Sequence, residues 1–286
     1  MKHRHRILRI TRYQLVQLIR NPRLYMIVIC NFIFLSTLMS SLRAFLEMHQ
    51  LKATPFLFSF LFIHPSVIFC FLAGVALLFS NAPFFNRSQM YLTIRTGKIV
   101  WAVGQICYII LGSVLYFLML YLMSLIFLFP HISFRNEWGN VCNTLARTDA
   151  GLNSGIPLQV PVDILNQFKP LEALGWTCMM GILNAVLIGL VLFFCNLFLK
   201  REVGIAAAML VILAPYRLSF MPTPIHYLAT AAWLDPSYLF YSPTYRGPDA
   251  IQQILILGVL ITILFLGCIY GILHKDLPEV EELTIP

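Results

Sequence analysis

Residues 99–134 read IVWAVGQICYIILGSVLYFLMLYLMSLIFLFPHISF, and this stretch contains no Asp, Glu, Lys or Arg. A helix needs about 20 predominantly apolar residues to cross a bilayer, because each residue rises about 1.5 Å and the hydrocarbon is about 30 Å thick. The stretch is therefore long enough to cross a membrane as one helix.

The rest of the chain has the same apolar character. Of its 286 residues, 59% are hydrophobic and 11% are charged, whereas a soluble domain has roughly 45–50% apolar and about 25% charged residues. This composition excludes an ordinary water-soluble enzyme, a disordered chain and a disulfide-rich secreted domain. Further runs without Asp, Glu, Lys or Arg cover residues 24–42, 53–86, 173–199, 203–216 and 250–274.

From these runs we predict an all-α polytopic membrane protein that forms a single transmembrane domain over residues 1–286. The fifth run reaches a spanning length only if it passes Arg217, whose long side chain can extend to the interface. Six transmembrane helices are expected, at residues 23–43, 56–80, 99–129, 173–199, 203–221 and 250–274.

The basic residues predict the orientation. If the N-terminus is cytoplasmic, most of the 20 Lys and Arg residues lie in cytoplasmic segments, as the positive-inside rule requires. We expect a multi-pass protein of the cell (plasma or cytoplasmic) membrane with both termini in the cytoplasm. The net charge of +8 indicates topology and not nucleic-acid binding, because the basic residues are divided among the membrane flanks.

The first 21 residues predict an amphipathic helix and not a signal peptide. Basic residues at positions 9, 12 and 20 interrupt every apolar stretch before the first span, whereas a signal peptide needs an unbroken apolar run. We expect residues 4–21 to lie in the inner headgroup region, although a simple basic anchor is an alternative. At 100° per residue, one face of this helix is shared by Ile7, Leu8, Thr11, Leu15, Leu18 and Ile19.

Three connections between spans also carry information. Residues 83–96 predict a short cytoplasmic helix that starts near Pro83 and stops at Gly97. Residues 130–172, rich in Asn, Gly and Pro, predict an irregular extracellular loop. Residues 222–249 predict short extracellular helices before the last span, because their prolines prevent one continuous helix and their Tyr and Trp residues prefer the headgroup level.

The sequence contains no motif that indicates catalysis. It has no Gly-rich phosphate loop, no metal-ligand spacing and no catalytic serine elbow. No Asp or Glu lies deep within an expected span, where ion-driven carriers usually keep such groups. We therefore expect a chain that is not an enzyme, has no cofactor of its own and needs an external motor for any transport. A disulfide between Cys142 and Cys178 is an open alternative.

The stretch from Arg95 to Gln105, RTGKIVWAVGQ, is similar to the segment that leads into the third span of many bacterial ABC permeases. With its amphipathic N-terminal helix, six spans and short helix between spans two and three, the chain resembles the permease (transmembrane) subunit of a bacterial type-two ABC exporter. The resemblance implies a dimer with a second permease copy or homologue, and two ATP-binding-cassette ATPase subunits that hold the ATP and magnesium.

By that resemblance, residues 83–96 form the coupling helix, which sits in a groove of the ATPase, and the N-terminal helix contacts its flank. Aromatic side chains can anchor such an interface and arginines can pair with carboxylates of a soluble partner. For Arg87 and Arg95, a contribution to membrane orientation alone is the alternative. The expected ATPase-coupling residues are Phe84, Phe85, Asn86, Arg87, Ser88, Gln89, Tyr91, Arg95, Arg9 and Arg12.

The expected transport pathway is mostly apolar, with scattered hydroxyl and amide groups. It suits export of an amphipathic or hydrophobic cargo such as a peptide, lipid or drug. The same polar groups can instead join helices to one another, and His64 before Pro65 can mark either a kink or a proton relay. The candidate pathway residues are Asn31, Ser36, Ser40, Ser59, His64 and Asn184.

Two other classes of function stay open at this point. The chain can be a membrane channel or scaffold that needs no ATPase, or an integral membrane enzyme acting on lipid through a site that its sequence does not reveal. A neighbouring reading frame that encodes a phosphate-loop ATPase would favour the exporter.

Overall fold

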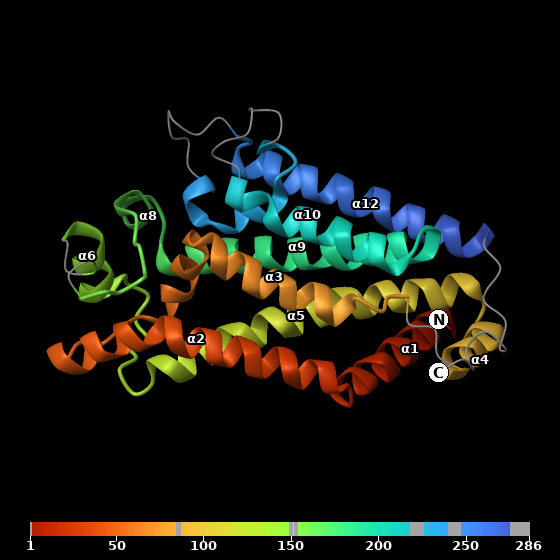
Figure 1. Ribbon diagram of the computed structural model, residues 1–286, viewed down its shortest axis with the longest axis horizontal. Coiled ribbons are helices and arrows are strands. Elements are labelled where there is room, and N and C mark those ends of the chain that lie inside the picture. Colours follow the sequence, from red (N-terminus) through yellow and green to blue (C-terminus); the bar gives the residue numbers. More distant parts are fainter. Residues whose placement is uncertain are drawn as a thin grey trace.

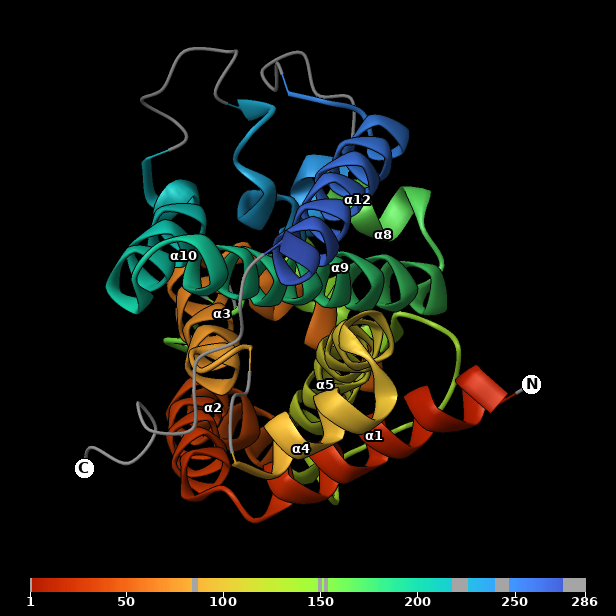
Figure 2. The same cartoon turned by 90° about the vertical axis from the view of Figure 1, so that its right-hand side faces the viewer.

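The structure is a computed structural model that describes residues 2–83, 87–148, 151, 154–217, 226–239 and 247–274. Throughout these residues the chain forms helices and no strand, as predicted for an all-α protein. The long helices run along one elongated bundle (Figure 1). Helix α9 (Pro170–Phe198) lies at its centre (Figure 2). On one side of it lie α10 (Arg201–Arg217) and α12 (Ala250–His274), and on the other side lie α3 (Pro65–Phe79) and α5 (Lys98–Leu128).

The expected N-terminal helix is present as α1 (Lys2–Ile19) and packs along α5 (Lys98–Leu128). Ile10 and Thr11 are buried there, and Thr11 Oγ1 donates a hydrogen bond to Gly104 O at 3.2 Å. A Cβ at Gly104 would lie 2.8 Å from Ile10 Cγ2, so this close approach requires glycine. Leu8 and Ile19 are exposed. One part of the apolar face predicted from the sequence therefore packs against the bundle, and the other part is exposed.

Helix α2 (Pro22–His49) extends past the expected end at residue 43. Its start is capped by Asn21, whose Oδ1 accepts from the backbone N–H of Arg23 at 3.0 Å. Arg43 and Glu47 form an ion pair of 2.8 Å one turn apart in the added segment. The end expected at residue 43 was placed too early. Arg43 ends the apolar run in the sequence, but a charged residue does not end a helix.

The second expected span, residues 56–80, is broken. It consists of a 3₁₀ helix, η1 (Pro55–Ile63), and α3 (Pro65–Phe79), which meet at an angle of 100°. The break follows from Pro65, which lacks an N–H and disfavours the helical conformation at the residue before it. His64 accordingly has φ −86° and ψ 121°.

The short helix after α3 is present as α4 (Arg87–Thr96) and is joined to α5 by Gly97. Gly97 has φ 91°, a value that favours glycine, and the predicted stop at this residue is confirmed. The predicted start is not, because Pro83 lies in a bend. Residues 84–86 lie outside the described part of the chain.

The 130–172 segment is more ordered than the irregular loop we expected. It contains α6 (Gly139–Arg147) and α8 (Val162–Gln167), and α9 begins at Pro170. The Trp138 indole N–H donates to Phe168 O at 2.9 Å, and the Ala53 N–H donates to His131 O at 2.8 Å. Cys142 and Cys178 are free thiols, so the disulfide left open above is absent.

The fifth expected span begins as α10 (Arg201–Arg217), and residues 218–221 lie outside the described part. Two 3₁₀ helices, η3 (Thr230–Leu234) and η4 (Pro236–Leu239), precede α12 (Ala250–His274), as predicted for short helices before the last span. All five residues of η3 are buried against the bundle.

Among the described residues, four helices are long and apolar enough to cross a membrane: α2, α5, α9 and α12. The bent pair η1 and α3 raises the number to five if it counts as one span. Helix α12 exposes Ile251, Leu255, Val259, Ile263 and Leu266 along its length. An exposed apolar face of this kind is suited to contact with lipid. The chain is an all-α protein whose apolar helices indicate a membrane-embedded bundle.

Charge is distributed unevenly along the bundle. We use the name basic end for the end that carries α1, α4, the turn from α9 to α10 and the last turns of α12 (Figure 1). Within the described residues, Glu202 is the one acidic residue at this end. Its Arg and Lys residues include Arg6, Arg9, Arg12, Arg20, Arg23, Arg95, Lys98, Lys200 and Arg201.

Candidate functional site

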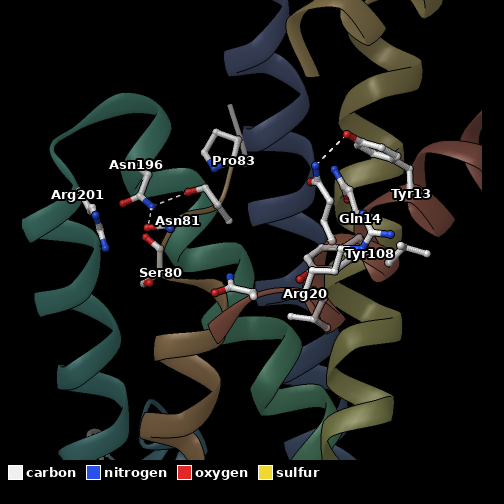
Figure 3. Close-up of a pocket in the computed structure, with 14 residues that line it drawn as sticks. Tyr13, Gln14, Arg20, Ser80, Asn81, Pro83, Tyr108, Asn196 and Arg201 are labelled. Carbon is white, nitrogen blue, oxygen red and sulfur yellow. Dashed lines mark hydrogen bonds between the residues drawn. The ribbon is translucent and has the colours of Figure 1, made fainter. Parts of the chain in front are cut away.

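A polar cavity of about 710 Å³ opens at the basic end, where α1, α5, α9 and α10 approach the segment that follows α3. Figure 3 shows Arg201 and Asn196 on one side of this cavity and Tyr13 and Gln14 on the other. Arg20, from the end of α1, also lines it. The cavity therefore combines guanidinium and amide groups contributed by segments that lie far apart in the sequence.

The segment after α3 is held in place by hydrogen bonds from three helices. Asn196 Nδ2 donates to Ser80 O at 3.2 Å and also to Ala82 O. Arg23 Nη1, from α2, donates to Ser80 Oγ at 3.3 Å, and Ser80 Oγ donates to Leu77 O at 3.0 Å within α3. Ser80 is thus a fixed point at which α2, α3 and α9 meet.

Two amide side chains of the polar cavity have unused hydrogen-bonding capacity. Gln14 is 3% exposed, and neither its Nε2 nor its Oε1 has a hydrogen-bond partner among the described residues. Asn196 Oδ1 is also buried without a partner in this part of the chain. Because buried polar groups are nearly always satisfied, these atoms indicate a missing polar partner such as water or a ligand.

A second, apolar cavity adjoins the first. We call it the apolar groove; it has a volume of about 750 Å³ and lies between α2, α3 and α10. Phe34, Phe69 and Ile205 contribute to its walls, and the exposed Met26 and Leu77 place it on the outside of the bundle. Its lining is almost entirely apolar.

The two cavities meet at the basic end, because Ser80 and Arg201 line both of them. Arg23 lines the apolar groove at the same end. No acidic side chain of the described residues lies within ion-pair distance of Arg20, Arg23 or Arg201. The junction therefore offers positive charge next to an apolar surface, an arrangement that suits a molecule with an anionic head and an apolar body.

A third cavity of about 640 Å³ lies between α1 and α4 and involves part of the expected ATPase-coupling set. Arg9 and Arg95 both line it, together with Arg6. Arg12 is exposed on α1 but does not line this cavity. The structure therefore brings Arg9 and Arg95 together at the basic end and leaves Arg12 apart.

The other expected coupling residues cannot be placed as side chains. Residues 84–86, which include Phe84, Phe85 and Asn86, lie outside the described part of the chain. The backbone of Arg87, Ser88, Gln89 and Tyr91 belongs to α4, but their side chains are outside that part.

Three of the expected pathway residues lie inside the bundle. Asn31 is 2% exposed, and its Nδ2 donates to Tyr116 Oη at 2.9 Å. Ser59 and Asn184 are completely buried and line neither the polar cavity nor the apolar groove. The Asn184 Nδ2 donates to Met180 O within its own helix. Asn31 therefore joins α2 to α5, as in the alternative interpretation, and it also lines the apolar groove. Ser59 Oγ has no hydrogen-bond partner among the described residues.

The remaining pathway residues lie nearer the end opposite the basic end. Ser36 and Ser40 line a groove of about 270 Å³ beside the Arg43–Glu47 pair. His64 is half-buried at the break before α3, and its Nε2 donates to Pro157 O. The six candidates thus do not line one cavity of the described residues.

His64 also lies close to a buried carboxyl group. Burial raises the pKa of Asp235, between η3 and η4, to about 6, and the nearby His64 partly opposes this shift. The Oδ1 atom of Asp235 accepts a hydrogen bond from the Ser237 backbone N–H at 2.8 Å. Within the described residues, no group of three or more His, Cys, Asp or Glu side chains could hold a metal ion.

Sequence reasoning did not select Gln14, Ser80, Asn196 or Arg201 as site residues. One signal was available for Gln14, because it lies three residues after Thr11 and four before Leu18, on the helix face that is otherwise apolar. The other three come from separate segments, and only folding brings them to one cavity.

The fold and this site together define a class: an all-α protein with the features of a membrane-embedded bundle and an amphipathic cavity at its basic end. We compared the chain with protein-family models, with curated proteins and with solved structures, and none of the three comparisons gave a match.

Proposed function

We propose that this chain is the non-catalytic membrane subunit of an ATP-driven exporter that moves an amphipathic or hydrophobic molecule. The observation that carries this proposal is the junction of the polar cavity and the apolar groove at Ser80 and Arg201. The two cavities offer one molecule a polar site and an apolar site side by side. Because the groove lies on the outside of the bundle, such a molecule can enter from the surrounding lipid.

In this proposal the chain crosses the membrane six times. The spans are α2, the bent pair η1 and α3, α5, α9, the span expected from the sequence at residues 203–221, which begins in α10, and α12. The basic end faces the cytoplasm, since cytoplasmic segments of membrane proteins are enriched in Lys and Arg. Both termini are then cytoplasmic, and the chain belongs to the cell membrane.

A separate ATPase supplies the energy, since the sequence contains no Gly-rich phosphate loop. The cavity between α1 and α4 is the proposed contact for that subunit, with Arg9 and Arg95 pairing with its carboxylates. Both helices connect directly to α5, α1 by packing at Gly104 and α4 through Gly97. Movement of the ATPase can therefore reach the bundle through α5, as in the type-two ABC exporters that the sequence resembles.

Purification of the tagged chain from the membranes of its own host tests this function. We expect a co-purifying subunit that hydrolyses ATP in the presence of magnesium. The double variant Arg9→Glu with Arg95→Glu should insert normally but lose most of the co-purified ATPase activity. The matched control is Arg135→Glu with Arg147→Glu, two exposed arginines outside the basic end, which should retain it.

Two results would contradict the proposal. One is equal ATPase activity in the two double variants, or none with the unaltered chain. The other is uphill accumulation of an amphipathic molecule by the purified chain alone in liposomes, because a chain with its own energy source needs no ATPase.

A further inference from the structure

We infer that the polar cavity and the apolar groove together hold one phospholipid with an anionic phosphate and a hydroxyl-bearing headgroup, drawn from the leaflet at the basic end. As an identification of the exported molecule, this inference rests on the proposed function. As a binding site, it can be tested without transport.

The charge at the junction favours a phosphate group. Arg201, which lines both cavities, and Arg23, which lines the apolar groove, contribute two guanidinium groups there, and Arg20 adds a third within the polar cavity. None of the three has an acidic partner among the described residues. Arginine is suited to phosphate, because its planar fork can donate two parallel hydrogen bonds to the phosphate oxygens. The bond from Arg23 Nη1 to Ser80 Oγ keeps one guanidinium at the point where the cavities meet.

The unpartnered Gln14 amide favours a headgroup that carries a hydroxyl. The buried Gln14 side chain lines the polar cavity and offers one donor group and one acceptor. A phosphate oxygen can accept from the Gln14 Nε2, whereas the Gln14 Oε1 needs a donor, which a hydroxyl group supplies. A glycerol headgroup meets both requirements. A choline headgroup has no hydrogen-bond donor, and its positive charge would face the arginines.

The apolar groove suits the acyl chains of the same molecule. Its volume of about 750 Å³ lies in the range of sites that enclose small molecules. Asn31 lines it, but the Asn31 amide is already engaged with Tyr116 Oη and with the Cys70 thiol. The Asn31 amide is therefore not free to oppose an acyl chain. Other polar residues also line the groove, Arg23, Ser80 and Arg201 at the basic end and Ser66 and Tyr216 elsewhere, but most of its surface is apolar.

A second copy of this chain is the alternative occupant of the groove. Related by a two-fold axis along the membrane normal, it would bring the same arginines to the same depth, so that like charges would face each other. A lipid phosphate neutralises these charges instead, which is why we assign the groove to the lipid.

Native mass spectrometry of the purified chain tests the assignment. The protein is equilibrated in micelles with equal amounts of phosphatidylglycerol and phosphatidylcholine, and retained lipid is counted. We expect one bound phosphatidylglycerol, favoured by about tenfold or more, because its hydroxyls can donate to the Gln14 amide oxygen and because choline would place a positive charge beside the arginines. Arg23→Gln with Arg201→Gln should lower the retention of both lipids, which share the phosphate, and should weaken the preference. Arg135→Gln with Arg147→Gln should change neither. Ala73→Phe, which fills the groove, should lower retention of both lipids.

A second comparison isolates the hydroxyl groups. Phosphatidylmethanol carries the same phosphodiester charge without a headgroup hydroxyl, so the unaltered chain should prefer phosphatidylglycerol to it. Gln14→Leu removes the buried amide without introducing a polar group and should lessen that preference severalfold, while phosphatidylglycerol remains favoured over phosphatidylcholine.

Equal retention of phosphatidylglycerol and phosphatidylcholine would overturn the inference, as would lipid retention and a preference that are both unchanged in the paired Arg→Gln variant. A lipid-free dimer would show that a second copy fills the groove and would overturn it as well. Failure of ATPase co-purification would contradict the proposed function and would not change the lipid count, so the two failures are distinguishable.

Discussion

Asn31 on α2 donates a hydrogen bond to the hydroxyl of Tyr116 on α5 at 2.9 Å, and both side chains are buried. The Tyr116 hydroxyl in turn donates to Phe71 O on α3 at 2.8 Å. One hydroxyl group therefore links three helices, two of which, α2 and α3, line the apolar groove. Lipid offers no hydrogen-bond partner to these groups, so in an apolar bundle they can bond only with one another.

Replacement of Tyr116 by Phe should destabilise the bundle by about 1–2 kcal/mol, since it leaves the Asn31 amide buried without its acceptor. Equilibrium unfolding in mixed micelles measures this loss. In the double variant Tyr116→Phe with Asn31→Leu, the loss of stability should be smaller than the sum of the losses in the two single variants, because both substitutions remove the same bond. Strictly additive effects would show that the bond contributes nothing.

Gly104 should not tolerate a larger side chain. Gly104→Val places carbon atoms against Ile10, and overpacking of this kind typically costs about 1–3 kcal/mol. We expect α1 to separate from α5, which faster proteolysis at the arginines of α1 would detect. The additional change Ile10→Ala should restore part of the protection. Gly258→Val on α12, where a Cβ meets nothing within 4 Å, is the matched control.

The Asp235 carboxyl predicts a specific pH dependence. Burial raises the pKa of this group from 3.8 to about 6, so the folded chain retains a proton that the unfolded chain releases. Its contribution to stability is therefore greatest at acidic pH and is lost as the pH rises through about 6. Asp235→Asn keeps an acceptor for the Ser237 N–H and removes the ionisable group.

The Asn variant should thus be more stable than the unaltered chain at pH 7.5 and lose that advantage near pH 4.5, as measured by thermal unfolding. Asp163→Asn, at an exposed position in α8, is the control and should give no such crossover. An advantage for Asp235→Asn that is the same at both pH values would contradict the burial of this carboxyl.

The packing of the 130–172 segment can be tested with thiol reagents. Cys142 is completely buried beside Thr54, and burial raises the pKa of its thiol to about 12. We expect it to resist a membrane-impermeant maleimide until the protein is denatured. A cysteine introduced by Asn140→Cys, an exposed position on the same helix, should react at once.

Applied to intact cells, the same reagent tests orientation. Labelling of the Asn140→Cys variant from outside would agree with a cytoplasmic basic end. Labelling only after lysis would reverse the proposed topology.

Sequence patterns predicted much of this architecture because hydropathy and turn chemistry act locally. The apolar runs located α5, α9 and α12 to within a few residues, and Gly97 marked the end of α4. Local patterns failed where the structure of a segment depends on contacts with residues that are distant in the sequence. Residues 130–172 read as an irregular loop, since the contacts that order it come from elsewhere, such as the bridge between Ala53 and Ile132.

The amino-acid sequence by itself determined that this chain is helical and apolar and that its basic residues gather between the apolar runs. Only the tertiary structure decided that Gln14, Ser80 and Arg201 line one cavity, while Ser59 and Asn184 are enclosed in the bundle. The physical reason is that burial of a polar side chain and charge at a cavity depend on neighbours that are distant in the chain. Periodicity along one helix carries no information about them.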